Sequence, residues 1–309
     1  MRIRDFPQLM EKASRYPRAR VAVAAAEDRE VLEAVKLGWE KGLISPILVG
    51  SEKEIRGQAA EIGFSLADSD VFGVADAAAS ARKAVELVSS GEADVVMKGF
   101  VGTSIFLKAV LNPEYGLRTG KLLSHLAAFE IPRFPRLLFM TDGGVNIAPD
   151  LAQKREILQN AVDAVTALGY SEPKVALLAA VEVVNPQMGA TIDAASLSKM
   201  ADRGQVKGAL VDGPLALDNA IDREAALHKG IISPVAGEAD ILLVPDIEAG
   251  NVLAKSFSFL AGGTMAGIVM GSKAPIVLPS RADSAYSKLC SLVLASLVYH
   301  GSRRGPEDE

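Results

Sequence analysis

The sequence is poor in cysteine, histidine and aromatic residues, and these gaps narrow the chemistry that it can carry. Its 309 residues include one cysteine and three histidines, and aromatic residues make up 5% of the chain. The single cysteine, Cys290, excludes a disulfide within the chain and a cysteine-rich metal cage. It lies in an apolar helical stretch, which favours a core position over a reactive thiol. The histidines are scattered, so a histidine-based zinc site has little support.

Long apolar runs and signal segments are also missing. No run approaches the ~20 apolar residues that span a bilayer, and residues 1–20 contain no apolar signal core. The net charge is −5 without a basic stripe, which argues against a nucleic-acid surface. We therefore expect a soluble cytoplasmic protein that binds neither membranes nor nucleic acid.

Two common nucleotide-binding motifs are incomplete or absent. The stretch GLRTGK at 116–121 resembles a phosphate loop, but its glycine spacing is one residue short. Leu122 also replaces the Ser or Thr that would hold magnesium. No G-x-G-x-x-G follows the first predicted strand. These departures weaken the interpretations as a P-loop kinase or a Rossmann dehydrogenase.

Short apolar runs alternate with helical patterns along the chain. The runs are nearly continuously apolar, as in strands that are buried on both faces. Asp28 is a plausible cap of the first helix, and Ser51 and Glu54 have the spacing of a capping box. The alternation predicts an α/β fold with mostly parallel sheets flanked by helices, in two lobes with a cleft between them. Strands are predicted at 20–27, 45–50, 93–99, 136–142, 174–182, 207–213, 239–246 and 274–280.

Polar residues gather where these strands end. The carboxyl ends of parallel strands lie at one edge of a sheet, and open α/β sheets bind their ligands there. Successive polar ends therefore predict a composite binding cleft. The residues at these ends are Lys98, Thr141, Asp142, Asn185, Asp212, Asp246, Ser280 and Arg281.

Several of these loops lead into predicted helix N-termini, which favour a bound anion. Gly250 and Asn251 open a helix after Asp246, and Ser284 opens the last helix. The guanidinium of Arg281 can donate two hydrogen bonds at once to a tetrahedral oxyanion. The simplest ligand for such a cleft is a phosphate group. Further positive charge would come from Lys98, Arg118 and Lys255.

The histidines and two further aspartates have less support as functional residues. His125, which follows Ser124, is better placed than His228 or His300, and we keep Ser124 and His125 as candidate binding residues. Asp218 and Asp222 are interpreted as turn or cap residues rather than ligands.

Seven long stretches carry a resemblance to a known family. They are ADVVMKGFVGTSIFLKAVL, GLRTGKLLSH, TDGGVNIAPDL, EVVNPQMGATIDAASLSKMADRG, DGPLALDNAI, SPVAGEADILLVPDIEAGNVLAK and PIVLPSRADS. They resemble the phosphate acetyl/butyryltransferase family, and most closely its phosphotransbutyrylase branch. The resemblance spans most of the chain from about residue 93 to 284, and before residue 90 it is only architectural.

The resemblance implies a two-domain isocitrate/isopropylmalate-dehydrogenase-like fold with an interdomain cleft, usually in a homodimer. In such chains the last strand and helix return to the first domain. Residues 1–150 with 275–309 are therefore expected to form one α/β lobe, and 151–274 the other. The implied reaction converts acyl-CoA and orthophosphate to acyl phosphate and CoA, with no metal or other cofactor. The expected acyl group is butyryl or another short chain, with acetyl as an alternative.

The same resemblance assigns roles to particular residues. Arg281 matches the arginine that binds phosphate, and Ser280 matches the serine that donates a hydrogen bond to the departing sulfur. Backbone N–H groups near Gly250 and Asn251 would bind the carbonyl oxyanion. The acid proposed as a base in the acetyltransferase branch is missing here. Asp283 is the nearest carboxylate and is either a substitute base or a helix cap.

Two alternatives stay open at this point. One is a metal- and NAD-dependent hydroxy-acid dehydrogenase of the same fold, for which Asp212, Asp218 and Asp246 are the only candidate metal ligands. The other is a CoA-binding protein without turnover, because the catalytic acid of the acetyltransferase branch is absent.

Overall fold

The protein divides into two compact units. The computed structural model describes residues 2–67 and 70–303. Unit 1 contains the chain up to Asp5 together with Leu122–Met265, and unit 2 contains Phe6–Lys121 together with the chain from Ala266 onward. The lobe boundaries near residues 150 and 275 and the cleft between the lobes stay predictions. Each unit is described by itself.

Unit 2 is built from two segments of the chain, residues 6–121 and the segment that begins at residue 266. Its helices are α1 (Phe6–Ala13), α2 (Arg29–Glu40), α3 (Glu52–Glu61), α4 (Ala77–Ser89), α5 (Thr103–Val110) and α11 (Ala285–Gly301). Its strands are β1 (Ala19–Ala24), β2 (Ile44–Gly50), β3 (Val71–Gly73), β4 (Val95–Lys98), β11 (Ile276–Val277) and most of β10 (Thr264–Met270).

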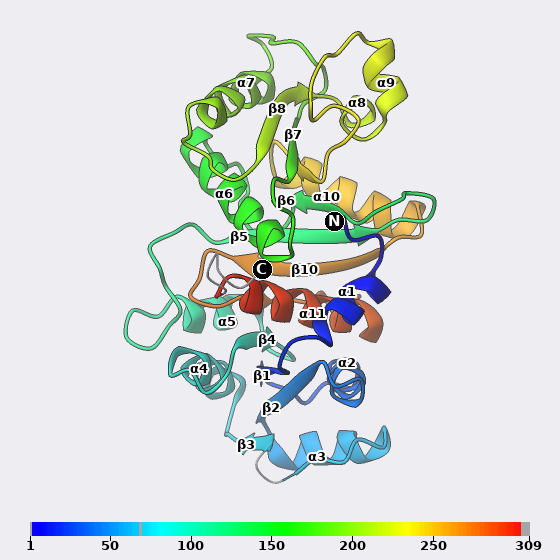
Figure 1. Ribbon diagram of the computed structural model, residues 1–309. Coiled ribbons are helices and arrows are strands. Elements are labelled where there is room, and N and C mark those ends of the chain that lie inside the picture. The colour runs from blue at the N-terminus through cyan, green and yellow to red at the C-terminus, as the bar shows by residue number, and fades with distance from the viewer. Residues whose placement is uncertain (1, 68–69, 304–309) are drawn as a thin grey trace. The chain divides into compact units, whose positions relative to one another are not determined.

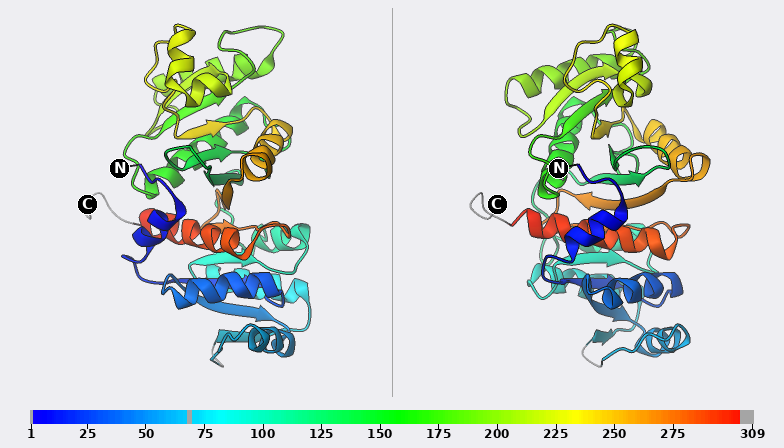
Figure 2. Two further views of the ribbon diagram at one scale, coloured as in Figure 1. Left: turned by 90° about the vertical axis from the view of Figure 1, so that its right-hand side faces the viewer. Right: turned by 45° about the vertical axis from the view of Figure 1, so that its right-hand side comes forward.

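The sheet of unit 2 is mostly parallel. Its strand order is β3-β2-β1-β4-β11-β10, and β10 pairs antiparallel with β11 while the other neighbours are parallel. Helices α4 and α5 lie on one face, and α2 and α11 on the other (Figure 1). Helix α11, in red, lies beside α1 and α2, in blue, so the first and last helices of the chain pack together within this unit (Figure 2).

Unit 1 is a second α/β arrangement. Its strands are β5 (Ser124–Glu130), β6 (Leu138–Thr141), β7 (Lys174–Leu178), β8 (Leu210–Leu215) and β9 (Ile241–Leu243). Its helices are α6 (Leu151–Ala167), α7 (Gly189–Asp202), α8 (Leu217–Ile221), α9 (Arg223–His228), α10 (Ile247–Lys255) and the π-helical turn η2 (Ser256–Leu260) that continues α10.

The sheet of unit 1 has the order β5-β6-β9-β7-β8, with β5 antiparallel to β6 and the other pairs parallel. Alternate strand residues such as Leu138, Met140 and Leu242 join one core with residues of α8, α9, α10 and η2. Helices α6 and α7 lie on the opposite face of the sheet (Figure 1). The predicted class, α/β with mostly parallel sheets flanked by helices, is confirmed.

Helix caps show where local sequence reasoning held and where it failed. Asp28 caps α2 as predicted, because its carboxylate accepts from the N–H of Val31 at 2.9 Å. The capping box predicted at Ser51 is wrong, since Ser51 precedes α3 without a side-chain hydrogen bond. A complete capping box instead starts α6, where Asp150 and Gln153 bond each other's backbone N–H groups.

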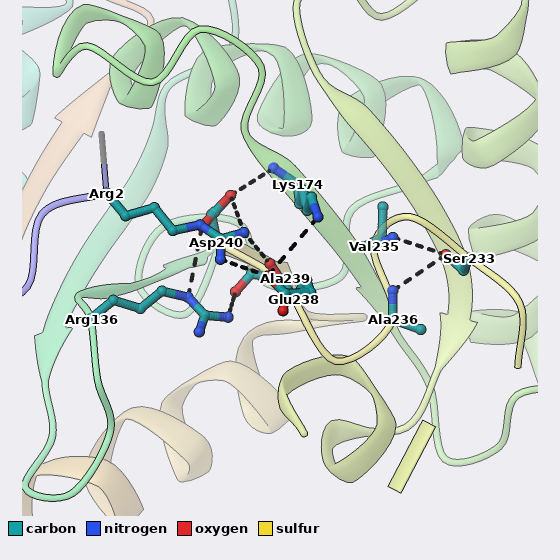
Figure 3. A network of polar contacts seen from close by, with 9 residues as sticks. All are labelled: Arg2, Arg136, Lys174, Ser233, Val235, Ala236, Glu238, Ala239 and Asp240. Atoms are coloured by element: carbon teal, nitrogen blue, oxygen red, sulfur yellow. Dashed lines mark hydrogen bonds and ion pairs between the residues drawn. The ribbon is translucent and has the colours of Figure 1, made fainter. Parts of the chain in front are cut away.

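A charged network fastens the first residues onto unit 1 at the amino ends of β7 and β9 (Figure 3). Arg2 donates from Nη1 to Glu238 Oε2 at 2.7 Å, and its Nε lies 2.7 Å from Asp240 Oδ1 as an ion pair. Asp240 Oδ2 also accepts from the backbone N–H of Lys174 at 3.0 Å. Arg136 donates to the carbonyl of Ala239 at 2.9 Å. Because acids and bases are interleaved here, the buried charge of Asp240 is compensated.

Within residues 2–67 and 70–303, the structure has no helix with the length and apolarity needed to cross a membrane.

Candidate functional site

The loops that follow three adjacent parallel strands of unit 2 line one narrow pocket. These loops come after β1, β4 and β11. The pocket has a volume of about 30 Å³, and its wall includes Lys98, Gly99, Phe100, Ser280, Arg281 and Lys288. A cavity needs roughly 10–15 Å³ of such space to hold one water molecule, so the pocket admits a small polar group.

Strand register brings Lys98 and Arg281 to the same edge of the sheet. Ile276 and Val277 of β11 pair with Val96 and Met97 of β4, so Lys98 at the end of β4 and the loop with Arg281 after β11 both reach this edge. The loop after β4 then turns tightly over β1. A Cβ at position 99 would lie 2.2 Å from the carbonyl oxygen of Ala25, so only glycine fits there.

The pocket carries an excess of positive charge. Three basic side chains, Lys98, Arg281 and Lys288, line it with two acidic ones, Asp28 and Glu30. The pKa of Lys98 is lowered, first because the side chain is buried and then because the Arg281 guanidinium is near. Burial and a neighbouring like charge therefore both disfavour the protonated form of Lys98. An anion placed between the two cations would relieve this repulsion.

Arg281 stands at the mouth of this pocket with an exposed side chain. Its guanidinium carbon lies 5.8 Å from the centre of the Phe100 ring, a cation–π contact. Among residues 2–67 and 70–303, no carboxylate forms an ion pair with it. Arg281 thus combines a positioned guanidinium with unused hydrogen-bond donors.

Asp283 holds the turn that presents Ser280 and Arg281. Its carboxylate accepts from the backbone N–H of Ser280 at 2.8 Å, and its own N–H donates to the carbonyl of Ser280 at 3.2 Å. The interpretation of Asp283 as the helix cap is wrong. Ser284 caps α11 instead, as its hydroxyl accepts from the N–H of Ser287, and this start of the last helix is confirmed.

Lys288 belongs to the pocket although sequence reasoning did not select it. Its side chain is only 3% exposed and is ion-paired with Glu30 at 2.8 Å. Its ammonium also donates to the carbonyl oxygen of Asp283, which ties the first turn of α11 to the Ser280–Asp283 turn. The available signal was a lysine directly before Leu289 and Cys290, at the start of the apolar run of the last helix.

In unit 1, the loop after β6 is built around Asp142. Its carboxylate accepts from the backbone N–H groups of Gly144 and Val145 at 2.9 Å, and from the side-chain amide of Asn146 at 2.6 Å. Thr141 donates from its hydroxyl to the carbonyl of His125 at 2.8 Å. Both predicted residues therefore stabilise the loop, and their polar atoms are engaged within the unit.

This loop packs directly against α10. A Cβ at position 250 would lie 2.7 Å from the Cα of Gly143, so the two backbones meet without side chains between them. Asp246 caps α10 by accepting from the N–H of Ala249 at 2.8 Å.

The expectation that Gly250 and Asn251 open this helix is wrong, because α10 begins at Ile247. The N–H of Gly250 donates to the carbonyl of Asp246 at 3.1 Å, as the helical bond pattern requires. The N–H of Ile247 donates to the carbonyl of Ile147. The start of α10 has therefore used most of the donors that an oxyanion would need.

The other candidates in unit 1 lie on β5, in the turn before α7 and at the end of α10. Ser124 is buried and accepts from the amide of Asn160 at 2.9 Å, which holds α6 onto β5. Asn185 accepts from the N–H of Gln187 in a turn before α7. His125 is half-buried on β5. Lys255 lies in the last turn of α10, 5.6 Å from the Phe259 ring centre, far along the helix from its N-terminus.

One candidate differs from its expected position. Asp212 was expected after a strand, but β8 continues to Leu215, so Asp212 lies within the strand and its carboxylate accepts from the next N–H. Arg118, in unit 2, is exposed in the loop before β5. Within that loop Thr119 donates to the carbonyl of Gly271 at 2.5 Å.

The metal ligands that a dehydrogenase would need do not gather. Asp212, Asp218 and Asp246 come from β8, α8 and the α10 cap, respectively. In the part of the chain that the structure describes, no three or more His, Cys, Asp or Glu side chains form a group that could hold a metal ion.

Both units are α/β arrangements with mostly parallel sheets, and a cationic pocket lies at the strand ends of unit 2. This combination defines an α/β protein with an anion-attracting pocket. The family model described as phosphate acetyl/butaryl transferase matches residues 6–82 and 74–296. The chain belongs to this family, and it is accordingly an enzyme of the phosphate acyltransferase class.

Individual relatives agree with this assignment. The chain is 50% identical over 296 residues to a phosphate butyryltransferase of Clostridium acetobutylicum, a match that covers 96% of this chain and 98% of the relative. It is 44% identical over 292 residues to a phosphate acetyltransferase of Thermotoga maritima, with 94% and 99% covered. The sequence-based recognition of the family is confirmed.

Solved structures extend the comparison. A branched-chain phosphotransacylase from Enterococcus faecalis V583 matches with a TM-score of 0.81 and 34% identity, covering 91% of this chain and 99% of that one. A 4-hydroxythreonine-4-phosphate dehydrogenase from Klebsiella pneumoniae matches with a TM-score of 0.54 and 13% identity, covering 91% and 99%. The second likeness concerns the fold alone.

Proposed function

We propose that this protein transfers a short acyl group from CoA to orthophosphate, giving acyl phosphate and free CoA. Membership of the phosphate acetyl/butaryl transferase family supports the reaction type. The observation that carries the proposal to particular residues is the cationic pocket of unit 2. Arg281 there has no carboxylate partner among the described residues, and Lys98 has a lowered pKa because of burial and the nearby Arg281.

Arg281 binds the attacking phosphate in this proposal. Its planar fork matches two phosphate oxygens at once, and the buried ammonium of Lys98 adds charge behind it. A phosphate oxygen then forms a bond to the thioester carbonyl carbon, and the carbon–sulfur bond breaks with its electron pair leaving on sulfur. Orientation of the two reactants contributes on the order of 7–11 kcal/mol in well-organised systems.

Ser280 stabilises the departing sulfur. Its hydroxyl accepts from the N–H of Ala282 at 3.3 Å, which orients the oxygen and leaves the O–H proton free to point outward. A hydrogen bond from this O–H to the developing thiolate lowers the barrier to carbon–sulfur cleavage. The residue needs no base for this role, because it donates and is not deprotonated.

Asp283 positions these two residues. Its carboxylate is committed to the N–H of Ser280, so it holds the turn while Arg281 and Ser280 contact the substrates. Phosphate already carries a negatively charged oxygen near neutral pH, and position is what it lacks. We therefore assign Asp283 a positioning role rather than that of the base.

The finer features of the function stay predictions. We expect butyryl or another short acyl group, since the relatives include both a butyryltransferase and an acetyltransferase. A homodimer is also expected and is tested by the mass of the protein in solution.

The decisive experiment measures thiol release from butyryl-CoA with and without orthophosphate. We expect release only with phosphate, in equal amount with acyl phosphate, and unchanged activity in the presence of a chelator. Release without phosphate would identify a thioesterase instead. Binding of butyryl-CoA without turnover, or reduction of NAD by a hydroxy acid with magnesium, would refute the proposal.

A further inference from the structure

Unit 1 contains a second and larger pocket with the opposite character. It has a volume of about 510 Å³ and lies beyond the carboxyl ends of β7 and β9, between the start of α7 and one side of α10. Five apolar side chains form much of its wall: Leu178, Met188, Leu217, Val244 and Leu253. Ligand pockets typically occupy ~300–1,000 Å³, so this one has the size of a binding site.

The pocket exists because small residues line it. Gly189, Ala190 and Ala249 line it, and they leave space where larger side chains would fill the gap between α7 and α10. A Cβ at position 189 would meet no atom within 4 Å. The position of the pocket, at the strand ends of a parallel sheet, is where ligands of open α/β folds bind.

The pocket offers almost no polar partner. Thr191 is the single hydroxyl residue in its wall, and no charged side chain lines it. The Thr191 hydroxyl is already used, because it donates toward the carbonyl of Met188 at 2.8 Å and accepts from the N–H of Asn185 at 2.9 Å. A buried charged or polar group of a ligand would find almost no side-chain partner here, so the wall favours a hydrocarbon occupant.

We propose that this pocket binds the hydrocarbon chain of the acyl group and that its wall sets the preference of the enzyme among chain lengths. The inference rests on the proposed acyltransferase function. Of the parts of an acyl-CoA, the phosphates and the adenine need polar partners, whereas the acyl chain is the extended hydrocarbon. A cavity of about 150 Å³ lined by aliphatic side chains holds benzene, with six carbons. A pocket of about 510 Å³ therefore has more than enough room for a chain of four or five carbons, branched or straight.

Two opposite substitutions test the proposal. Ala249→Leu adds a side chain at the wall while keeping a good helix former in α10. Met188→Ala removes a side chain that is 38% exposed, so it enlarges the pocket without opening a buried core. Ala152→Leu is the matched control, since Ala152 is exposed on α6 of the same unit and lies outside the pocket wall. The readout is kcat/KM for acetyl-, butyryl- and hexanoyl-CoA at saturating phosphate.

We expect Ala249→Leu to lower kcat/KM for butyryl-CoA about tenfold or more relative to acetyl-CoA, because one misplaced methylene changes discrimination by roughly 10–200-fold. Met188→Ala should raise the hexanoyl-to-butyryl ratio, and Ala152→Leu should leave all ratios unchanged. Equal losses for all three thioesters in Ala249→Leu, or unchanged ratios in both pocket variants, would overturn this assignment. In either case, phosphate-dependent release of CoA by the unchanged enzyme would still support the proposed function. Failure of the proposed function itself would instead be seen as CoA release without phosphate.

Discussion

Two charged clusters of this protein show how similar residues serve different purposes. In unit 1, Arg2, Arg136 and Lys174 meet Glu238 and Asp240 at the amino ends of strands (Figure 3). In unit 2, the basic residues Lys98, Arg281 and Lys288 line a pocket at the carboxyl ends of strands. Both clusters contain three basic and two acidic side chains, so composition alone does not distinguish them.

The difference lies in how the charges are paired. Asp240 is contacted by Arg2, by Arg136 at 3.7 Å and by the N–H of Lys174, and its side chain is 4% exposed. The pocket of unit 2 pairs Lys288 with Glu30, but Arg281 has no carboxylate partner in the described parts of the chain. We call the cluster of unit 1 saturated because each of its basic side chains lies within 4.0 Å of a carboxylate, and such pairing fixes a segment in place. The cluster of unit 2 is unsaturated in this sense, because no carboxylate pairs with Arg281 in the described residues, and it attracts a ligand of opposite charge. Each prediction below tests one side of this distinction.

The largest effect is expected in the saturated cluster. Asp240→Asn removes the shared anion and leaves Arg2 and Arg136 facing each other with less compensation, so unfolding free energy should fall by about 3–5 kcal/mol. Denaturant unfolding measures this loss. The control Glu11→Gln breaks an exposed ion pair with Arg15 and should cost about 1 kcal/mol or less. If Asp240→Asn is as stable as the control, the saturated cluster does not hold unit 1 together.

The next effect concerns catalysis without a loss of stability. Arg281→Lys keeps the charge but loses the planar fork, so kcat/KM for phosphate should fall about 100-fold or more. Both KM for phosphate and kcat should change, while KM for acyl-CoA moves much less. Arg82→Lys, at an exposed arginine of the same unit, is the control. A raised KM for acyl-CoA alone would make Arg281 a CoA-binding residue.

The alternation of apolar runs and helical patterns predicted most strands, namely β1, β2, β4, β6, β7, β8, β9 and β11. The three-residue strand β3 was missed, although it lies between α3 and α4. Strands β5 and β10 were also missed. Each of these two is joined by a short connection to an antiparallel neighbour, β6 or β11, and no helix between them marks the boundary.

The site shows the same limit. Lys98, Ser280 and Arg281 follow parallel strands, so their convergence on one pocket was predictable from strand ends alone. Lys288 reaches the pocket from within α11, and only the packing of that helix brings its ammonium to Asp283 and Glu30. The error at Gly250 came from overlooking Asp246 as a cap, which moves the start of α10 to Ile247.

A smaller effect should separate positioning from base catalysis. In Asp283→Asn the side-chain carbonyl can still accept from the N–H of Ser280, so the turn is retained. We therefore expect kcat to stay within about fivefold of the unchanged enzyme, whereas loss of a general base would lower it by about 10²–10⁴. Asp283→Ala removes the acceptor and should lower kcat more than Asp283→Asn does. Equal, large losses in both variants would show that the carboxylate acts as a base.

The smallest effect concerns the ammonium of Lys98. It tests whether this buried charge in the pocket of unit 2 lowers the stability of the folded protein. Its folded-state pKa lies below the ordinary 10.5, because of burial and then Arg281. The charged form is therefore disfavoured by folding, so it lowers stability at neutral pH and this penalty disappears as pH rises toward 10.5. Lys98→Met removes the penalty but also two hydrogen bonds of 3.2 Å to the carbonyls of Gly99 and Val101.

These opposing contributions predict a change of about 1 kcal/mol or less in unfolding free energy at pH 7. The difference in unfolding free energy between Lys98→Met and the unchanged protein should change with pH. As pH increases from 7 to 10, the variant should become less stable relative to the unchanged protein. Orthophosphate should raise the melting temperature of the unchanged protein more than that of the variant, since ligand binding to the folded state stabilises it. A large loss of stability in Lys98→Met at pH 7, with an unaltered response to phosphate, would place Lys98 with the saturated cluster of unit 1 as a structural residue.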